Sequence, residues 1–151
     1  SEKMIEACEY LRGAPTGETV AVIGGGLTGS EIAYELALQG KKPVIVEMKD
    51  DLVSQKGVCL ANSSYLREWF ALHEVPVYLQ TVLKEVRDGS ILCTEKDGKE
   101  LEIPCDSVIS CAGYLSAPLP EAGKAQLVGD CRRVGNLRSV VWDAYEAAMK
   151  I

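Results

Sequence analysis

The chain has 151 residues, with 47% hydrophobic and 25% charged side chains and a formal net charge of −6. A chain of this length buries about 68–70% of its extended surface as one domain, and this composition is ordinary for a soluble globular protein. The acidic balance, without clustered basic residues, argues against a nucleic-acid partner. The apolar runs are far shorter than the ~20 residues that a membrane-spanning helix needs, and no signal peptide is expected. Both observations argue against a membrane role.

The six cysteines form no Cys-x-x-Cys pair, and they stand at Cys8, Cys59, Cys93, Cys105, Cys111 and Cys131. This spacing argues against a zinc ribbon, an iron–sulfur cluster and a redox pair within the chain, so no metal ligands are expected. Several cysteines stand in apolar runs, where the free thiol behaves as a small hydrophobic group. We therefore expect a reduced, cytoplasmic protein.

The first predicted element is a leading helix. Apolar residues at helical spacing predict a helix over residues 1–12, and the turn-forming residues 13–17 end it. Residues 1–17 are thus a leading helix and turn, and residues 18–118 are the predicted nucleotide-binding domain. That domain starts with a β-branched run over 19–23, which predicts a buried strand.

A glycine motif, Gly24-x-Gly26-x-x-Gly29, follows this strand directly. In such a motif the first glycine turns the chain, the second lets backbone approach a pyrophosphate, and the third lets the helix pack closely. A helix is predicted from about Leu27 to Gln39, with Gly40 behind it. The unpaired N–H groups and the dipole at its start predict a phosphate site.

An acidic residue, Glu47, closes the next predicted strand, residues 43–47, and stands about 20 residues after Gly26. A carboxylate at this place accepts hydrogen bonds from both ribose hydroxyls and repels a 2′-phosphate. Lys49 is the only nearby cation and makes a poor phosphate clamp beside Asp50 and Asp51. The sequence therefore favours NAD(H) over NADP(H).

A second helix is predicted from a cap at Asn62 or Ser63 to about His73, followed by a short strand over 76–79. The order βαβαβ predicts a right-handed, parallel, doubly wound sheet. His73, the only histidine, is expected at the surface or at the helix end. With no Ser or Cys partner indicated by a motif, it does not support a hydrolase triad.

The pattern then changes to short strands over 82–86, 90–94 and 100–103, separated by Asp-Gly pairs at 88–89 and 97–98. Asp-Gly pairs are typical of hairpin turns. One more buried strand, over 106–113, ends in small residues that suit a ligand crevice. The predicted fold class is α/β: a Rossmann-like doubly wound parallel sheet with an antiparallel three-stranded β-meander.

The last segment, residues 119–151, contains a strand-like run over 126–130 and a helical pattern over 137–149. The Gly129-Asp130 pair before that helix offers a second carboxylate, and another helix N-terminus, to a ligand.

Together these motifs resemble the C-terminal pyridine-nucleotide module of NADH:flavin oxidoreductases related to 2-enoate reductase and 2,4-dienoyl-CoA reductase. The residues that carry the resemblance are the run from Gly24 to Glu31, the meander, Cys111-Ala112-Gly113-Tyr114, Gly129-Asp130-Cys131, Gly135-Asn136-Leu137 and residues 143–148. The resemblance implies a longer parent protein, in which an old-yellow-enzyme-like barrel carries FMN and an iron–sulfur cluster. An FAD domain interrupted by an NAD(P) domain follows that barrel.

The resemblance implies that this chain is the NAD(H)-binding module of a flavin-dependent oxidoreductase. Residues 119–151 then match the returning part of the flavin domain. FAD, FMN and the cluster are expected only in the full-length protein, whose flavin and barrel domains are the expected partners.

The resemblance also assigns cofactor contacts. The glycine turn, Gly24 to Gly29 with Gly25, Leu27 and Thr28, would hold the cofactor, and Glu47 its adenosine ribose. The remaining contacts are Met48 and Lys49 at the adenosine, Thr81 and Val82 at the adenine, Ala112, Gly113 and Glu31 near the nicotinamide, and Asp130 toward the flavin. Glu31 has a second interpretation, as a favourable first-turn helix acid. No catalytic residue is expected, because the cofactors carry the chemistry.

Two alternatives stay open at this point. A stand-alone NAD-responsive regulatory domain uses the same βαβ unit without catalysis. A methyltransferase also ends its second strand with an acid, but its glycine loop is usually Gly-x-Gly-x-Gly, and Thr28 before Gly29 departs from that pattern.

Overall fold

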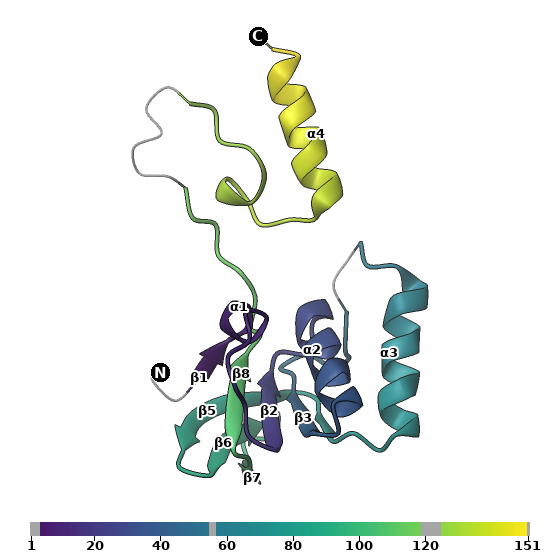
Figure 1. Cartoon of the computed structure of the whole chain (residues 1–151), viewed down its shortest axis with the longest axis vertical. Helices are drawn as coiled ribbons and strands as arrows, with labels where there is room; N and C mark the ends of the chain where they lie inside the picture. Colours follow the sequence, from purple (N-terminus) through teal and green to yellow (C-terminus); the bar gives the residue numbers. More distant parts are fainter. Residues whose placement is uncertain (1–3, 55–56, 119–124, 151) are drawn as a thin grey trace. The chain divides into compact units, whose positions relative to one another are not determined.

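The computed structural model describes residues 4–54, 57–118 and 125–150, and the chain divides into two compact units between Ala112 and Gly113. The first unit contains eight strands and three helices within its described residues (Figure 1). In chain order they are β1 (Met4–Glu6), α1 (Ala7–Tyr10), β2 (Thr19–Ile23), α2 (Leu27–Leu38), β3 (Lys42–Val46), α3 (Leu60–Leu72), β4 (Val77–Tyr78), β5 (Thr81–Arg87), β6 (Ser90–Glu95), β7 (Glu100–Pro104) and β8 (Ser107–Ser110).

The main sheet has five parallel strands in the order β1-β8-β2-β3-β4. Val22 at its centre is paired with Ile45 of β3 on one side and with Ile109 of β8 on the other. Because parallel strands all end at the same edge of a sheet, the segments that follow β2, β3, β4 and β8 come together there. The predicted α/β fold with a parallel sheet is confirmed.

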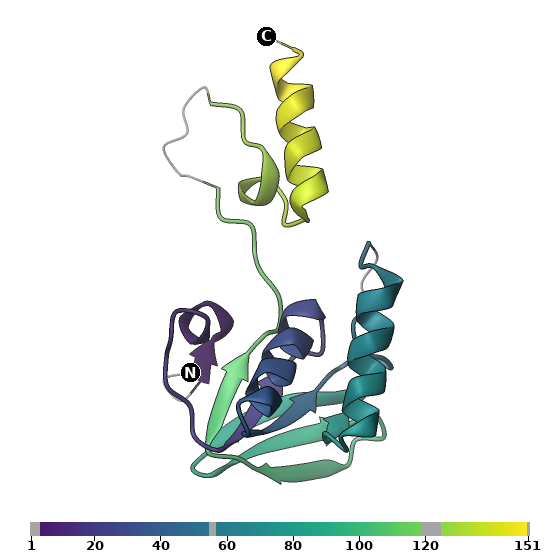
Figure 2. The ribbon, with the colours of Figure 1, turned by 45° about the vertical axis from the view of Figure 1, so that its right-hand side comes forward.

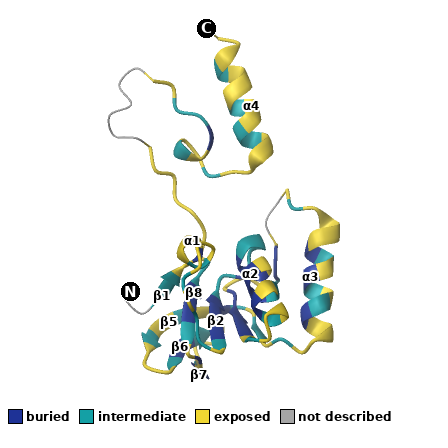
Figure 3. Cartoon of the chain, in the orientation of Figure 1, coloured by how far each residue is buried: buried dark blue, intermediate teal, exposed yellow. Residues whose placement is uncertain are grey.

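The two faces of this sheet are covered by different layers, which Figure 2 shows from the side. Alternate residues of a strand point to opposite faces, so Val20 and Val22 pack with α2 and α3, whereas Ala21 packs with the meander. Figure 3 shows that the buried residues are concentrated in the central strands of the sheet and in parts of α2 and α3. The largest fully buried side chain is Phe70 of α3, and full burial of such a side chain contributes about 1.5–3 kcal/mol.

The meander β5-β6-β7 is antiparallel, as its Asp-Gly turns predict. Gly89 and Gly98 have φ angles of 76° and 85°, which are the left-handed values that these hairpin turns need. Ile91, Cys93 and Ile103 of the meander pack against the main sheet. This layer takes the place that a crossover helix has in an all-parallel fold.

The prediction of a helix over residues 1–12 is wrong for residues Met4–Glu6, the first residues that the structure describes. Residues Met4–Glu6 form β1, and only Ala7–Tyr10 are helical, while residues 1–3 lie outside the described residues. Met4 is paired with Val108 of β8, about a hundred residues away in sequence. Because helical spacing is a local pattern, it does not detect this long-range pairing.

Helix α3 begins earlier than predicted. Its N-cap is Cys59, not Asn62 or Ser63, and the buried Ser63 hydroxyl donates a hydrogen bond to the Leu60 carbonyl within the helix. The helix ends as predicted, with the exposed His73 as its C-cap. The His73 ring stacks on Trp69 with ring centroids 3.9 Å apart.

The second unit contains a 3-10 turn, Gly129–Cys131, and helix α4, Leu137–Ala148. The strand predicted over 126–130 is absent from the described parts of this unit, residues 113–118 and 125–150, which offer it no strand to pair with. The predicted helix is confirmed, and a reciprocal capping box between Asn136 and Ser139 begins it. No residue of α4 is buried.

None of the helices in the described ranges is long and apolar enough to cross a membrane.

We predict that the cysteines differ sharply in reactivity. Cys8 and Cys59 are exposed, whereas burial raises the pKa of Cys93 to about 11 and that of Cys111 to about 12. At pH 8 both of these thiols are protonated, and Cys93 is also buried. An aromatic disulfide reagent should therefore modify Cys8 and Cys59 within seconds to minutes, Cys111 much more slowly, and Cys93 only after unfolding.

Mass mapping of the modified peptides measures these rates, with Cys59→Ser as the control that removes one fast site. Modification of Cys111 in the folded chain at the rate of Cys59 would contradict the structure.

Candidate functional site

The turn between β2 and α2 has no room for a side chain at its first glycine. Gly24 has a φ of 108°, and a Cβ placed there would lie 2.4 Å from the Cys111 carbonyl oxygen after β8. On its other side, the Gly24 N–H donates to the Val46 carbonyl at the end of β3, at 2.8 Å. The turn is therefore fixed between the ends of two neighbouring strands.

The first turn of α2 packs directly on this glycine turn. A Cβ on Gly29 would lie 1.8 Å from the Gly24 carbonyl oxygen, a backbone atom that cannot move away cheaply. A Cβ on Gly25 would lie 2.4 Å from Cδ2 of Leu52 and 3.0 Å from Cβ of Glu47. Contact with backbone thus requires glycine at positions 24 and 29, whereas a Cβ at position 25 would require the Leu52 side chain to move.

The start of α2 presents free backbone donors. The first α-helical hydrogen bond runs from the Ser30 N–H to the Gly26 carbonyl, at 2.9 Å. The N–H groups of Leu27, Thr28 and Gly29 come before it, so they have no carbonyl four residues back within the helix. These donors and the positive end of the helix dipole form a site for an anion such as a phosphate.

The Glu47 carboxylate is joined to the same turn by hydrogen bonds. Oε2 accepts the Gly25 N–H at 2.5 Å, Oε1 accepts the Lys49 N–H at 2.8 Å, and the residue is only 7% exposed. An ionised carboxylate has about four acceptor positions. Each oxygen therefore keeps capacity for one further donor, such as a pair of vicinal hydroxyls.

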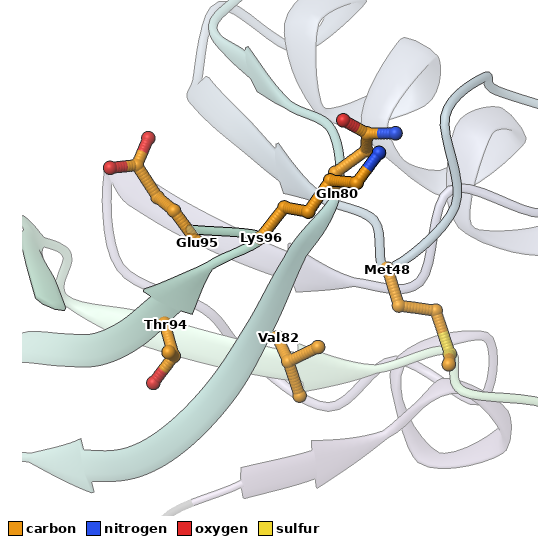
Figure 4. A pocket seen from close by; sticks show the side chains of 6 residues that line it. All are labelled: Met48, Gln80, Val82, Thr94, Glu95 and Lys96. Carbon is orange, nitrogen blue, oxygen red and sulfur yellow. The ribbon is translucent and has the colours of Figure 1, made fainter. Parts of the chain in front are cut away.

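A hollow of about 330 Å³ begins at the residue after Glu47 (Figure 4). Three parts of the chain line it: the loop after β3, the start of β5 with the residue before it, and the end of β6. The lining residues are Met48, Gln80, Val82, Thr94, Glu95 and Lys96. Met48 and Val82 are 70% and 52% exposed, so two apolar side chains stand open to a ligand there.

Gln80, Thr94, Glu95 and Lys96 were missed by the sequence analysis. Hairpin register places them: Val82 is paired with Thr94, and Thr81 with Glu95. The Asp88-Gly89 turn joins β5 to β6 and was available in the sequence, but a bulge between Leu83 and Glu85 shifts the register before it reaches Val82.

Other predicted contacts have different surroundings. Thr81 is 2% exposed, and its hydroxyl donates to the Leu79 carbonyl at 2.8 Å, so this side chain is turned inward. Ala112 is exposed and follows Cys111 at the Gly24 side of the sheet edge. The first turn of α2, which is fully described, has no acidic residue, so Glu31 is not the first-turn acid of the second interpretation.

Gly113 and Asp130 belong to the second unit. There the Asp130 carboxylate accepts the Gly135 N–H at 3.1 Å, just before α4. Among the described residues, no group of three or more His, Cys, Asp or Glu side chains is arranged to hold a metal ion.

A parallel sheet with a glycine turn and an acid after the next strand defines a Rossmann-like nucleotide-binding fold. Residues 1–133 match the family described as pyridine nucleotide-disulphide oxidoreductase. The chain belongs to this family.

Curated relatives agree with this assignment. The chain is 36% identical to cinnamate reductase of Clostridium sporogenes over 143 residues, and 30% identical to bilirubin reductase of Mediterraneibacter gnavus over 141 residues. It is 28% identical to NADH oxidase of Thermoanaerobacter brockii over 142 residues. Each match covers 89% of this chain and 21% of the relative, so the chain spans about a fifth of their length.

These relatives confirm the resemblance to NADH:flavin oxidoreductases of the 2-enoate reductase type, and the chain is an oxidoreductase domain.

Solved structures show the same fold at lower identity. 2-Naphthoyl-CoA reductase matches with a TM-score of 0.83 and 22% identity, over 100% of this chain and 24% of its own. Histamine dehydrogenase from Rhizobium sp. 4-9 matches with a TM-score of 0.82 and 17% identity, over 99% of this chain and 26% of its own. At these identities the likeness describes the fold alone.

We predict that Gly29→Ala lowers the free energy of unfolding by more than about 2 kcal/mol, because the added methyl group meets backbone. Gly40→Ala is the matched control: its φ is 80°, but a Cβ there meets no described atom within 4 Å. The control should cost only about 1–2 kcal/mol of left-handed strain. Urea denaturation measures both, and equal losses would show that the close approach at Gly29 has no energetic weight.

Proposed function

We propose that this chain binds NAD(H) at the carboxyl edge of its parallel sheet and presents the nicotinamide to a flavin carried by other domains of the parent protein. The observation that carries the proposal is the hydrogen bond between the Gly25 N–H and the buried Glu47 carboxylate. That bond supports the proposal because it holds a carboxylate, a potential acceptor for ribose hydroxyls, beside a turn whose N–H groups could donate to phosphates.

The phosphates would lie on the glycine turn. Gly24, Gly25 and Gly26 bring bare backbone to this edge, and Leu27, Thr28 and Gly29 supply the N–H groups at the start of α2. A diphosphate carries negative charge, which these donors and the helix dipole stabilise. The donor set therefore fits the central part of a dinucleotide.

The adenosine would lie on Glu47 and in the adjoining hollow. The two ribose hydroxyls donate to the free acceptor positions of Glu47, and the base packs between the apolar side chains of Met48 and Val82. Lys49 contributes its backbone N–H to Glu47, and Thr81 is buried between the lining residues Gln80 and Val82 in sequence. Lys96 and Gln80 both line this hollow, and in Figure 4 the Lys96 side chain runs toward Gln80.

This arrangement favours NAD(H) over NADP(H). A 2′-phosphate at the same ribose would meet the buried Glu47 carboxylate, and like charges at close range repel strongly where water is excluded. Lys49 is exposed, and Lys96 follows the acidic Glu95 in sequence. Neither lysine can bind a phosphate through two parallel hydrogen bonds from one planar group, as arginine does.

The nicotinamide end would extend toward β8. Ala112 follows that strand at the edge shared with Gly24, and by family resemblance Glu31 and Gly113 also belong to this end and Asp130 to the flavin. Nicotinamide supplies the hydride when it is bound. The residues of this chain bind and orient it, and none is needed as an acid or base. FAD, FMN and an iron–sulfur cluster belong to the remainder of the parent protein.

We predict that Glu47→Gln weakens NADH binding about tenfold or more, because hydrogen bonds to a charged group contribute about 1.5–3 kcal/mol. The ratio of the NADPH and NADH dissociation constants should fall at the same time, since the repulsive charge is removed. NADH fluorescence titration measures both constants. Glu18→Gln is the control, because Glu18 is an exposed carboxylate paired with Lys42. Equal affinity of the wild type and Glu47→Gln for both cofactors would contradict the ribose role.

We also predict that the 151-residue chain, supplied with NADH, free FAD or FMN and an enoate, shows no reductase turnover above the rate without protein. The module lacks a bound flavin placed against the nicotinamide, and such placement is what the protein contributes to hydride transfer. NADH absorbance at 340 nm follows the reaction. Turnover at rates typical of enzymes, about 1 s⁻¹ or faster, would refute the claim that this module needs the flavin domains of the parent protein for hydride transfer.

A further inference from the structure

We propose that Arg67, on α3, is a positioning residue for nucleotide binding: it holds the turn Asp51–Val53, which in turn orients the peptide between Gly25 and Gly26. This inference rests on the proposed function, because the oriented Gly26 N–H is one of the donors that face the phosphates.

Arg67 binds two consecutive residues of the loop that follows β3. Its Nε and Nη2 atoms donate to the Leu52 carbonyl at 2.9 and 2.6 Å, and Nη2 also pairs with the Asp51 carboxylate at 2.8 Å. The guanidinium group is rigid and planar, so a carbonyl held by two of its donors keeps one direction. Arg67 thereby fixes the plane of the Leu52–Val53 peptide.

The other side of that peptide binds the glycine turn. In a trans peptide the C=O and N–H groups point in opposite directions. The Leu52 carbonyl points to Arg67, and the Val53 N–H donates to the Gly25 carbonyl at 2.8 Å. One peptide unit therefore connects helix α3 to the turn between β2 and α2.

The backbone at Val53 does not hold this conformation by itself. Val53 is β-branched, has a φ of 48° and is 3% exposed. Such a residue in the left-handed region is strained and persists only where its surroundings determine its conformation. The Arg67 hydrogen bonds before Val53 and the Gly25 hydrogen bond after it supply that constraint.

The orientation of Gly26 follows from the same geometry. The Gly25 carbonyl accepts from Val53 and also from the buried Ser30 hydroxyl, at 3.2 Å. Because the Gly26 N–H belongs to the same peptide, it points the opposite way, away from Val53. The neighbouring peptide is fixed as well, since the Gly25 N–H donates to Glu47. A donor fixed before binding avoids the entropy cost of ordering it during binding.

The test is an NADH titration of the 151-residue chain with Arg67 varied. Arg67→Met removes all three contacts and should raise the dissociation constant about tenfold. Arg67→Lys keeps one cation that can reach the Leu52 carbonyl or Asp51, so it should restore part of the loss. Arg87→Met is the matched control: this arginine likewise binds two residues, through the carboxylates of Glu85 and Glu102, but lies in the meander, and its removal should leave the NADH constant unchanged.

A second measurement separates positioning from general destabilisation. In ¹⁵N–¹H spectra of Arg67→Met without cofactor, the amide resonances of Gly25, Gly26 and Val53 should shift or broaden, while those of β6 keep their positions. Two results would overturn the inference: a folded Arg67→Met variant that binds NADH as tightly as the wild type, or a Gly26 resonance that is unchanged in this variant. Failure of the wild type itself to bind NADH overturns the proposed function instead.

Discussion

The hydrogen bond from the Gly25 N–H to the Glu47 carboxylate is the interaction on which the site depends. It joins the turn after β2 to the end of β3, and it occupies a carboxylate that is almost completely buried. Burial of an ionised group is costly unless its acceptors are satisfied, and here two backbone amides satisfy it. None of the buried side-chain nitrogen or oxygen atoms in the described residues lacks a hydrogen-bond partner. Both carboxylate oxygens are thus held at the position where the proposed ribose hydroxyls would donate to them.

The packing of the glycines supports this interaction. Gly24 lies against the backbone after β8, Gly29 against the Gly24 carbonyl, and Gly25 against Leu52 and Glu47. Side chains at Gly24 and Gly29 would push the turn away from the backbone after β8 and from the start of α2. The same close contacts that hold the layers together therefore create the bare backbone surface at the sheet edge. Stability of the fold and formation of the site are one requirement in this part of the chain.

The sequence predicted the parts of this site that depend on local order. The spacing of Gly24, Gly26, Gly29 and Glu47 along β2, α2 and β3 is enough to predict a glycine turn beside a carboxylate. It did not predict Gln80 and Lys96, which meander register brings to the hollow, or Arg67, whose contacts reach a loop fifteen residues away. The strand β1 was missed for the same reason, because its partner β8 is distant in sequence. The prediction of a strand over 126–130 was wrong, because a strand needs a neighbouring strand to pair with, and an apolar run in the sequence does not show whether one is present.

The most direct test is a crystal structure of the chain with saturating NADH. We expect the diphosphate within hydrogen-bond distance of the Gly26 N–H and the first amides of α2, with both adenosine ribose hydroxyls on Glu47 and the base against Met48 and Val82. NADH bound elsewhere on the chain, or an empty sheet edge at saturating cofactor, would contradict it.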